Sequence, residues 1–159
     1  MAKKLTGTRC WLVKAEPDCY SIDDLKRDGR TCWDGVRNYQ ARNFMRDEMK
    51  VGEEVLFHHS GADPAGVVGV ARIGREGYAD HTALDPKADH FDPKASKDNP
   101  IWFMVDLEFV ERFPRVVTLR ELKERPDLEG MPLLQRGQRL SVMPVDSRHF
   151  GVVCRLGRG

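Results

Sequence analysis

Ile101-Trp-Phe-Met-Val-Asp-Leu-Glu-Phe-Val110 is the longest run in the chain with the pattern of a β-strand. Its first half is apolar on both faces. In its second half, apolar residues alternate with Asp106 and Glu108, which is the two-residue period of a strand with one buried face. The backbone groups of such a strand need partners, so we expect the rest of the chain to complete a sheet around it.

Shorter elements are predicted on both sides of this strand. Compact apolar runs predict further strands at residues 10–14, 55–59, 67–73 and 139–143. Helix starts are predicted at three capping side chains, Ser21, Thr118 and Asp146. Apolar residues spaced by four predict another helix over residues 38–49. Strands outnumber the short helices, so we expect an α+β fold, with a mixed, strongly bent sheet or barrel and peripheral helices.

The composition fits one soluble globular domain. A chain of 159 residues with 32% charged residues and a mean hydropathy of -0.54 is large enough and polar enough to fold alone in water. No apolar run approaches the ~18 residues that a membrane-spanning helix requires. The net charge of +1 excludes a polybasic coat but permits a local basic patch.

The N-terminus and the cysteines bear on the cellular compartment. Residues 1–8 include lysines but no apolar run, so no secretory signal is expected. The cysteines, Cys10, Cys19, Cys32 and Cys154, form no C-x-x-C pair and are interpreted as reduced thiols. We therefore expect a cytoplasmic protein, or a nuclear one if the source is eukaryotic, without a structural zinc site.

Common cofactor signatures are missing from the sequence. Neither G-x-x-x-x-G-K-[ST] nor G-x-G-x-x-G occurs, and no histidine or carboxylate spacing matches a known metal motif, so we expect no cofactor and no metal. His58 and His59 should point to opposite faces of their strand, one of them inward. The polar segment 78–100, with two Asp-Pro-Lys units, is predicted to be a surface flap.

The most distinctive stretch is Cys32-Trp-Asp-Gly-Val-Arg-Asn-Tyr-Gln-Ala-Arg-Asn43. Its arginines suit phosphates, its amides suit base edges, and its aromatic rings suit stacking on bases. We expect a few phosphate contacts from Arg37, Arg42 and Arg46, the last two on one helix face. Two interpretations of Trp33 remain open at this point: it lines a ligand pocket, or it fills the core beside a capped helix.

These residues also carry a family resemblance. The motifs in question are 11–17 (WLVKAEP), 20–25 (YSIDDL), 33–43 (WDGVRNYQARN), 55–60, 66–69 (GVVG), 102–106 and 139–142. In this order they resemble the EVE domain family and are similar to thymocyte nuclear proteins. The resemblance implies a PUA-like fold, a bent and mostly antiparallel β-barrel with short peripheral helices, in one domain over residues 9–155 behind an N-terminal tail of residues 1–8.

The resemblance further implies a nucleic-acid-binding module that reads a modified base. Methylated or hydroxymethylated cytosine is the leading ligand, in DNA ahead of RNA, and no catalysis is expected. The oligomeric state stays open, with a monomer as the expectation. The residues implied to line the pocket are Trp11, Lys14, Glu16, Trp33, Gly35, Val36, Arg37, Asn38, Tyr39, His59, Ser60, Trp102 and Ser141. Two alternatives stay open: an RNA-processing enzyme like the ASCH relatives, and a small-molecule sensor that uses the same pocket.

Overall fold

A computed structural model describes residues 9–159 of the chain, and the predicted tail of residues 1–8 lies outside the described residues. The elements follow one another as β1 (Cys10–Ala15), α2 (Ile22–Asp28), β2 (Arg30–Cys32), α3 (Tyr39–Asn43), η1 (Phe44–Glu48), β3 (Glu54–His59), β4 (Gly66–Ala79), η2 (His81–Leu84), β5 (Phe103–Thr118), α4 (Leu119–Lys123), η3 (Pro126–Leu128), η4 (Pro132–Leu134), β6 (Val142–Val145) and α5 (Ser147–Arg158). Within this part of the chain, no helix is long and apolar enough to cross a membrane.

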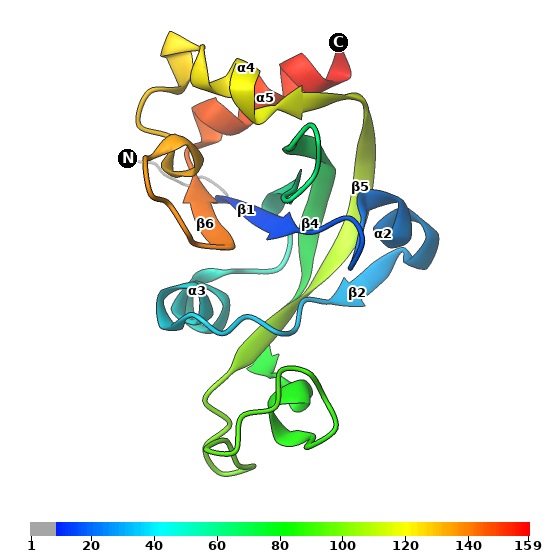
Figure 1. Ribbon diagram of the computed structural model, residues 1–159, viewed down its shortest axis with the longest axis vertical. Helices are drawn as coiled ribbons and strands as arrows, with labels where there is room; N and C mark the ends of the chain where they lie inside the picture. Colours follow the sequence, from blue (N-terminus) through cyan, green and yellow to red (C-terminus); the bar gives the residue numbers. More distant parts are fainter. Residues whose placement is uncertain (1–8) are drawn as a thin grey trace.

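The strands form one bent, mixed sheet in the order β2-β5-β4-β3-β1-β6. Strands β1 and β3 pair in parallel, and the other four neighbouring pairs are antiparallel. The expected α+β class is therefore confirmed, although β2 and β6 remain at the two ends of an open strand order instead of closing a barrel. The long strands β4 and β5 run the length of the molecule (Figure 1), and four register shifts between them add to the bend.

Several strand boundaries differ from the prediction. Strand β5 starts at Phe103 and runs on to Thr118, well past the predicted end. Its second half was missed because charged side chains interrupt the alternation and pair on the surface, as Glu111 does with Arg158. The short edge strand β2 was not predicted, since its three residues give no periodic signal. Strand β6 begins only at Val142, three residues later than predicted, and the Lys14 N–H donates to the Ser141 carbonyl just before it.

The sheet separates two hydrophobic cores, and alternate residues of one strand enter different cores. On β1, Trp11 and Val13 belong to one core, whereas Leu12 belongs to the other. The second core is closed by α5, which buries Phe150 and Val153 against the sheet. Figure 1 shows α4 and α5 together at one end of the sheet and α3 near its middle.

The capping residues start the helices as predicted. Ser21 and Thr118 each form a complete capping box, and the Asp146 side chain accepts from the Arg148 N–H. The helix predicted over residues 38–49 is real but divided: α3 passes into a π-helical turn, η1, before Met49. The predicted apolar face of this helix, Ala41, Met45 and Met49, is buried in the first core.

The segment that follows β4 forms a separate projection. Tyr78 and Ala79, expected in a loop, instead extend β4. Beyond them, residues 80–102 connect β4 to β5 through the short helix η2 and lie at the opposite end of the molecule from α4 and α5 (Figure 1).

Strands β4 and β5 approach each other so closely that adding one methyl group at Gly69 should destabilise the fold. A Cβ added at Gly69 would lie 2.3 Å from the Glu111 carbonyl oxygen, which is backbone and cannot rotate away. We expect Gly69→Ala to lower the free energy of unfolding by roughly 1–3 kcal/mol, as overpacking does. Urea denaturation of the purified variant measures this.

The matched control is Gly151→Ala on α5. There the added Cβ meets only the Arg155 guanidinium, at 3.6 Å, which is ordinary contact. Alanine favours a helix over glycine by about 0.5–1 kcal/mol, so this variant should be slightly more stable than the parent chain. Equal effects from both variants would show that β4 and β5 are not packed as closely as described.

Candidate functional site

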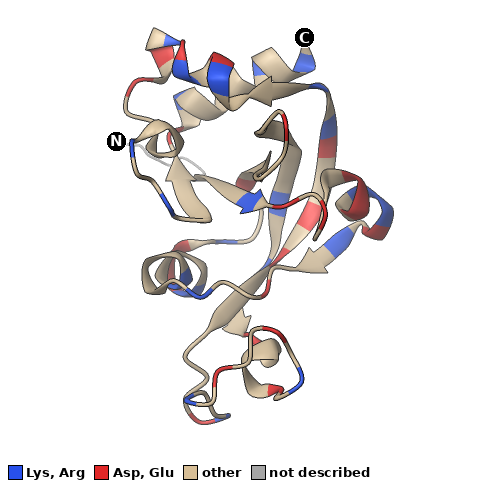
Figure 2. Ribbon diagram, viewed as in Figure 1, with Lys and Arg blue, Asp and Glu red and all other residues tan. Residues whose placement is uncertain are grey.

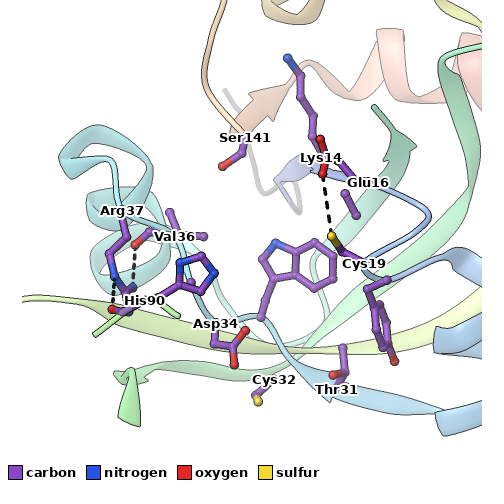
Figure 3. A pocket seen from close by; sticks show the side chains of 14 residues that line it. Lys14, Glu16, Cys19, Thr31, Cys32, Asp34, Val36, Arg37, His90 and Ser141 are labelled. Carbon is purple, nitrogen blue, oxygen red and sulfur yellow. Dashed lines mark hydrogen bonds between the residues drawn. The ribbon is translucent and has the colours of Figure 1, made fainter. Parts of the chain in front are cut away.

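A cavity of about 480 Å³ opens between the end of β1, the loop that follows it, β2 and the loop that leads to α3. This volume lies within the range of about 300–1,000 Å³ that small-molecule sites occupy. The residues that line it are Lys14, Ala15, Glu16, Cys19, Tyr20, Thr31, Cys32, Trp33, Asp34, Gly35, Val36, Arg37, His90 and Ser141. Figure 3 shows that they converge on it from segments far apart in the sequence.

Part of the predicted pocket is assembled here. The predicted residues that line the cavity are Lys14, Glu16, Trp33, Gly35, Val36, Arg37 and Ser141. Unpredicted lining residues include Ala15, Cys19 and Tyr20 near the end of β1. They also include Thr31 and Cys32 on the unpredicted strand β2, and His90 from the projection. Nothing in the sequence around His90 could have indicated its position, because a long segment brings it back to the site.

Trp33 joins the cavity to the core. Its side chain is only 9% exposed and belongs to the first core, yet it also lines the cavity. The edge-to-face rings of Tyr20 and Phe57, with centroids 6.2 Å and 5.5 Å away, fix its orientation. The core interpretation of Trp33 is therefore confirmed, and the same ring presents part of its surface to the cavity.

Hydrogen-bond donors and acceptors surround Trp33, which forms the aromatic wall of the cavity. Figure 3 shows Glu16 and Asp34 on different sides of the cavity and Ser141 on a third. The Cys19 thiol lies 3.8 Å from a Glu16 carboxylate oxygen. Burial lowers the pKa of Lys14, whose side chain extends past Glu16 (Figure 3). Carboxylates that accept and hydroxyl or ammonium groups that donate can together satisfy the edge of a planar heterocycle.

A buried carboxylate holds the loop of the cavity in place. Asp80 is fully buried, and its Oδ2 accepts from the Gly35 N–H at 2.8 Å and from Arg37 Nη1 at 2.9 Å. Its other oxygen accepts from the backbone and hydroxyl of Thr82. Burial raises the pKa of Asp80, but hydrogen bonds from Thr82, Gly35 and Arg37 outweigh it and hold the pKa below its ordinary value.

The glycine in this loop has a specific requirement. Gly35 has a φ of +80°, in the left-handed region, and an added Cβ would lie 2.7 Å from the His90 ring. Only glycine therefore lets the loop turn and lets His90 close against it. The projection contributes one wall of the cavity in this way.

The expectation that Arg37 contacts phosphate is corrected by its hydrogen bonds. Its guanidinium donates to the His90 carbonyl, to Asp80 and Thr82, and to the Val36 carbonyl. These five bonds match the five N–H groups of an arginine, so no donor is left for a phosphate. Arg37 is a structural residue that joins the projection to the cavity loop.

Other predicted pocket residues lie outside the cavity. Trp11 is fully buried, and its indole N–H donates to Glu53 at 2.9 Å. His59 Nε2 accepts from the Ile22 N–H at the start of α2. Asn38 caps α3, and Ser60 lies near a second hollow described below. Core packing or capping accounts for the contacts of the first three.

Tyr39 and Trp102 form a stack outside the cavity. Their ring centroids are 4.8 Å apart, and the Trp102 indole N–H donates to Asp92 at 2.7 Å. Tyr39 is 60% exposed, with the Arg42 guanidinium 4.9 Å from the centre of its ring. Arg42 also donates to the Ile101 carbonyl, whereas Arg46 pairs with its neighbour Asp47.

Comparison with known proteins identifies the class and then the family. A structure of the YTH domain of Zygosaccharomyces rouxii MRB1 protein in complex with N6-methyladenosine RNA matches with a TM-score of 0.56 at 13% identity, which shows a shared PUA-like fold. The EVE domain model matches residues 9–156, so this chain belongs to the EVE domain family.

One curated relative and two solved structures are similar to this chain. Human thymocyte nuclear protein 1 is 42% identical over 92% of this chain and 72% of its own length. A structure of human THYN1 protein in complex with 5-methylcytosine-containing DNA matches with a TM-score of 0.85 at 41% identity, over 95% of this chain and 98% of that one. A Pseudomonas putida protein matches with a TM-score of 0.89 at 50% identity, over 92% and 98%.

The buried carboxylate predicts the effect of Asp80→Asn. One of the asparagine's two polar atoms is a donor, so an N–H of Gly35, Arg37 or Thr82 loses its acceptor. We expect a loss of about 3 kcal/mol in the free energy of unfolding at pH 7, near the low end for breaking a buried pair. Because the folded pKa of Asp80 is lowered, the advantage of the parent chain should be full above about pH 4 and shrink below it.

Urea denaturation at neutral and acidic pH measures both effects. The exposed carboxylate of Asp98 provides the control, and Asp98→Asn should leave the stability nearly unchanged. A similar stability for Asp80→Asn and the parent chain at pH 7 would contradict the role given to this carboxylate.

Proposed function

We propose that this chain is a binding module that takes a flipped, modified cytosine of DNA, methylated or hydroxymethylated at C5, into the Trp33 cavity. One observation carries the proposal: the cavity combines an aromatic wall with carboxylate and hydroxyl groups placed around it. The crystallised relative in complex with 5-methylcytosine-containing DNA supports the choice of base.

The chemistry of the cavity suits the cytosine edge. The exocyclic amino group of cytosine donates hydrogen bonds, and Glu16 or Asp34 can accept them. The ring nitrogen and carbonyl of cytosine accept hydrogen bonds, and Ser141 or Lys14 can donate them. The base would then lie against Trp33, with its C5 substituent facing the apolar part of the wall.

The energy balance favours a flipped base. Flipping costs a few kcal/mol. Stacking on an aromatic side chain returns about 1–3 kcal/mol per base, and edge hydrogen bonds return more. Trp33 is already fixed by Tyr20 and Phe57, so it loses little side-chain entropy on binding.

The outer surface supplies a second contact. The exposed ring of Tyr39, backed by Trp102, can stack on a neighbouring nucleotide, and Arg42 lies beside it. Of the three arginines predicted to contact phosphates, Arg42 and Arg46 remain as candidates on this face. With few such contacts, unmodified DNA should bind weakly and with a shallow dependence on salt.

The absence of turnover is part of the proposal. The main rival is an RNA-processing enzyme, and the shifted Lys14 is the group that would favour it. Against it, no activated nucleophile can be read from the sequence. Incubation with labelled DNA and RNA separates the two functions, because a reader gives saturable binding without product.

A eukaryotic relative carries a nuclear name, which favours the nucleus over the cytoplasm where a nucleus exists.

The central test compares oligonucleotides that differ only at C5 of one cytosine. We expect tighter binding of the methylated or hydroxymethylated strand than of the unmodified one, measured by fluorescence anisotropy. Trp33→Phe keeps an aromatic ring in the core but shortens the stacking surface, so affinity should fall by about fivefold, equivalent to ~1 kcal/mol. The alanine variant is less informative, because loss of this buried ring would cost roughly 3–5 kcal/mol of stability.

Trp11→Phe is the matched control, since Trp11 is buried in the same core but does not line the cavity. It should bind the modified strand as the parent chain does. Equal affinity of the parent chain for modified and unmodified strands would refute the proposal. Equal loss in both tryptophan variants would point to a general effect on folding.

A further inference from the structure

A second hollow of about 590 Å³ lies on the far side of Lys14 from Trp33. It is formed where the end of β3 meets the start of α4 and the segment before β6 (Figure 1). We call it the basic basin, and its polar lining residues include Lys14, His58, Ser60, Lys123, Arg136 and Gln138. Lys14 is common to the basin and the Trp33 cavity.

The charge of the basin is one-sided. Among residues 9–159, Lys14, Lys123 and Arg136 line it, and no aspartate or glutamate does. Over residues 9–159, acidic and basic side chains are otherwise interspersed (Figure 2), and many arginines pair with a carboxylate. The three cations of the basin form no ion pair among the described residues. One carboxylate borders it, since Glu16 Oε1 would lie 3.4 Å from a Cβ added at Gly61.

A buried histidine in the wall lacks a partner. His58 is 2% exposed, and its Nε2 has no hydrogen bond within the described part of the chain. Its Nδ1 lies 3.1 Å from the Ser60 hydroxyl. Burial, with the nearby charges of Lys14 and His59, lowers the pKa of His58 to about 4, so the ring is neutral at pH 7. When the Ser60 hydroxyl donates to Nδ1, Nε2 carries the proton and becomes a free donor.

The geometry points to a phosphate-binding site in the basic basin. Two ammonium groups, a guanidinium and the His58 ring, whose Nε2 is unpaired among the described residues, line one hollow. The Ser60 hydroxyl and the Gln138 amide are uncharged groups of the same hollow that can also form hydrogen bonds. Donors that converge from several elements match the several oxygens of a phosphoryl group better than the two oxygens of a planar carboxylate.

The shared wall suggests where the phosphate comes from. A base in the Trp33 cavity and a phosphate in the basin would lie on the two sides of Lys14. A DNA strand could supply both, and this assignment of the source rests on the proposed function. A free phosphate ion has the same chemistry, so the test treats the two sources separately.

The first arm uses inorganic phosphate alone. We expect saturable NMR shifts of the His58 ring and the Gln138 side-chain amide as phosphate is added to the full chain. Lys123→Ala/Arg136→Ala, which removes two cations at the surface of the basin, should weaken this binding at least tenfold. The control Lys26→Ala/Arg155→Ala removes the same charges from exposed positions on α2 and α5 and should bind as the parent chain does.

The second arm uses the methylated oligonucleotide. Replacing one phosphate beside the modified nucleotide by a neutral methylphosphonate should weaken binding to the parent chain but not to Lys123→Ala/Arg136→Ala. The double variant should also lower the salt slope by about 1. Saturable binding of inorganic phosphate without any effect of methylphosphonates on either side would support the basin with a free ion as its ligand.

The outcomes separate the two proposals. If phosphate saturates the basin while methylated and unmodified strands bind equally, the proposed function fails and the phosphate site stands. If phosphate shifts neither His58 nor Gln138, and Lys123→Ala/Arg136→Ala binds the strand as the Lys26→Ala/Arg155→Ala control does, the phosphate site is refuted.

Discussion

The buried carboxylate of Asp80 is the constraint on which the cavity depends. It lies at the start of the projection, yet it binds the backbone of Gly35 and the side chain of Arg37 in the loop before α3. Arg37 in turn donates to the His90 carbonyl, which fixes the far part of the projection. A segment that would otherwise be a loose connection between β4 and β5 thus becomes one wall of a site. The five hydrogen bonds of Arg37 stabilise this arrangement. Because they use all of its N–H groups, Arg37 has no donor left to bind a phosphate.

Trp33 shows how stability and binding share one side chain. Its ring is packed edge-on by Tyr20 and Phe57, so the core fixes its orientation before any ligand arrives. The small remaining exposure faces the cavity. A preorganised wall of this kind costs little to use in binding. The stack of Tyr39 on Trp102 differs from this, because the Trp102 ring is buried whereas the Tyr39 ring is exposed on the surface.

The sequence predicted the features that depend on local chemistry. Ser21, Thr118 and Asp146 mark helix starts because capping is decided within four residues. Alternation located the centre of β5 but not its end, where surface ion pairs replace buried side chains. The family resemblance predicted correctly that Trp33 and Glu16 line the cavity. The composition could not show that Trp11 and His59 make their contacts elsewhere. His90 and the basic basin depend on segments that meet only in the folded chain, so no local pattern indicates them.

In the proposed complex, the modified base lies against Trp33. The most direct measurement is an intermolecular NOE experiment on the complex with an oligonucleotide that carries a ¹³C-labelled C5 methyl group on one cytosine. We expect NOEs from this methyl group to the indole protons of Trp33 and to the methyl groups of Val36. NOEs to Tyr39 and Trp102 alone, at saturating strand, would place the base on the outer surface and contradict binding in the Trp33 cavity.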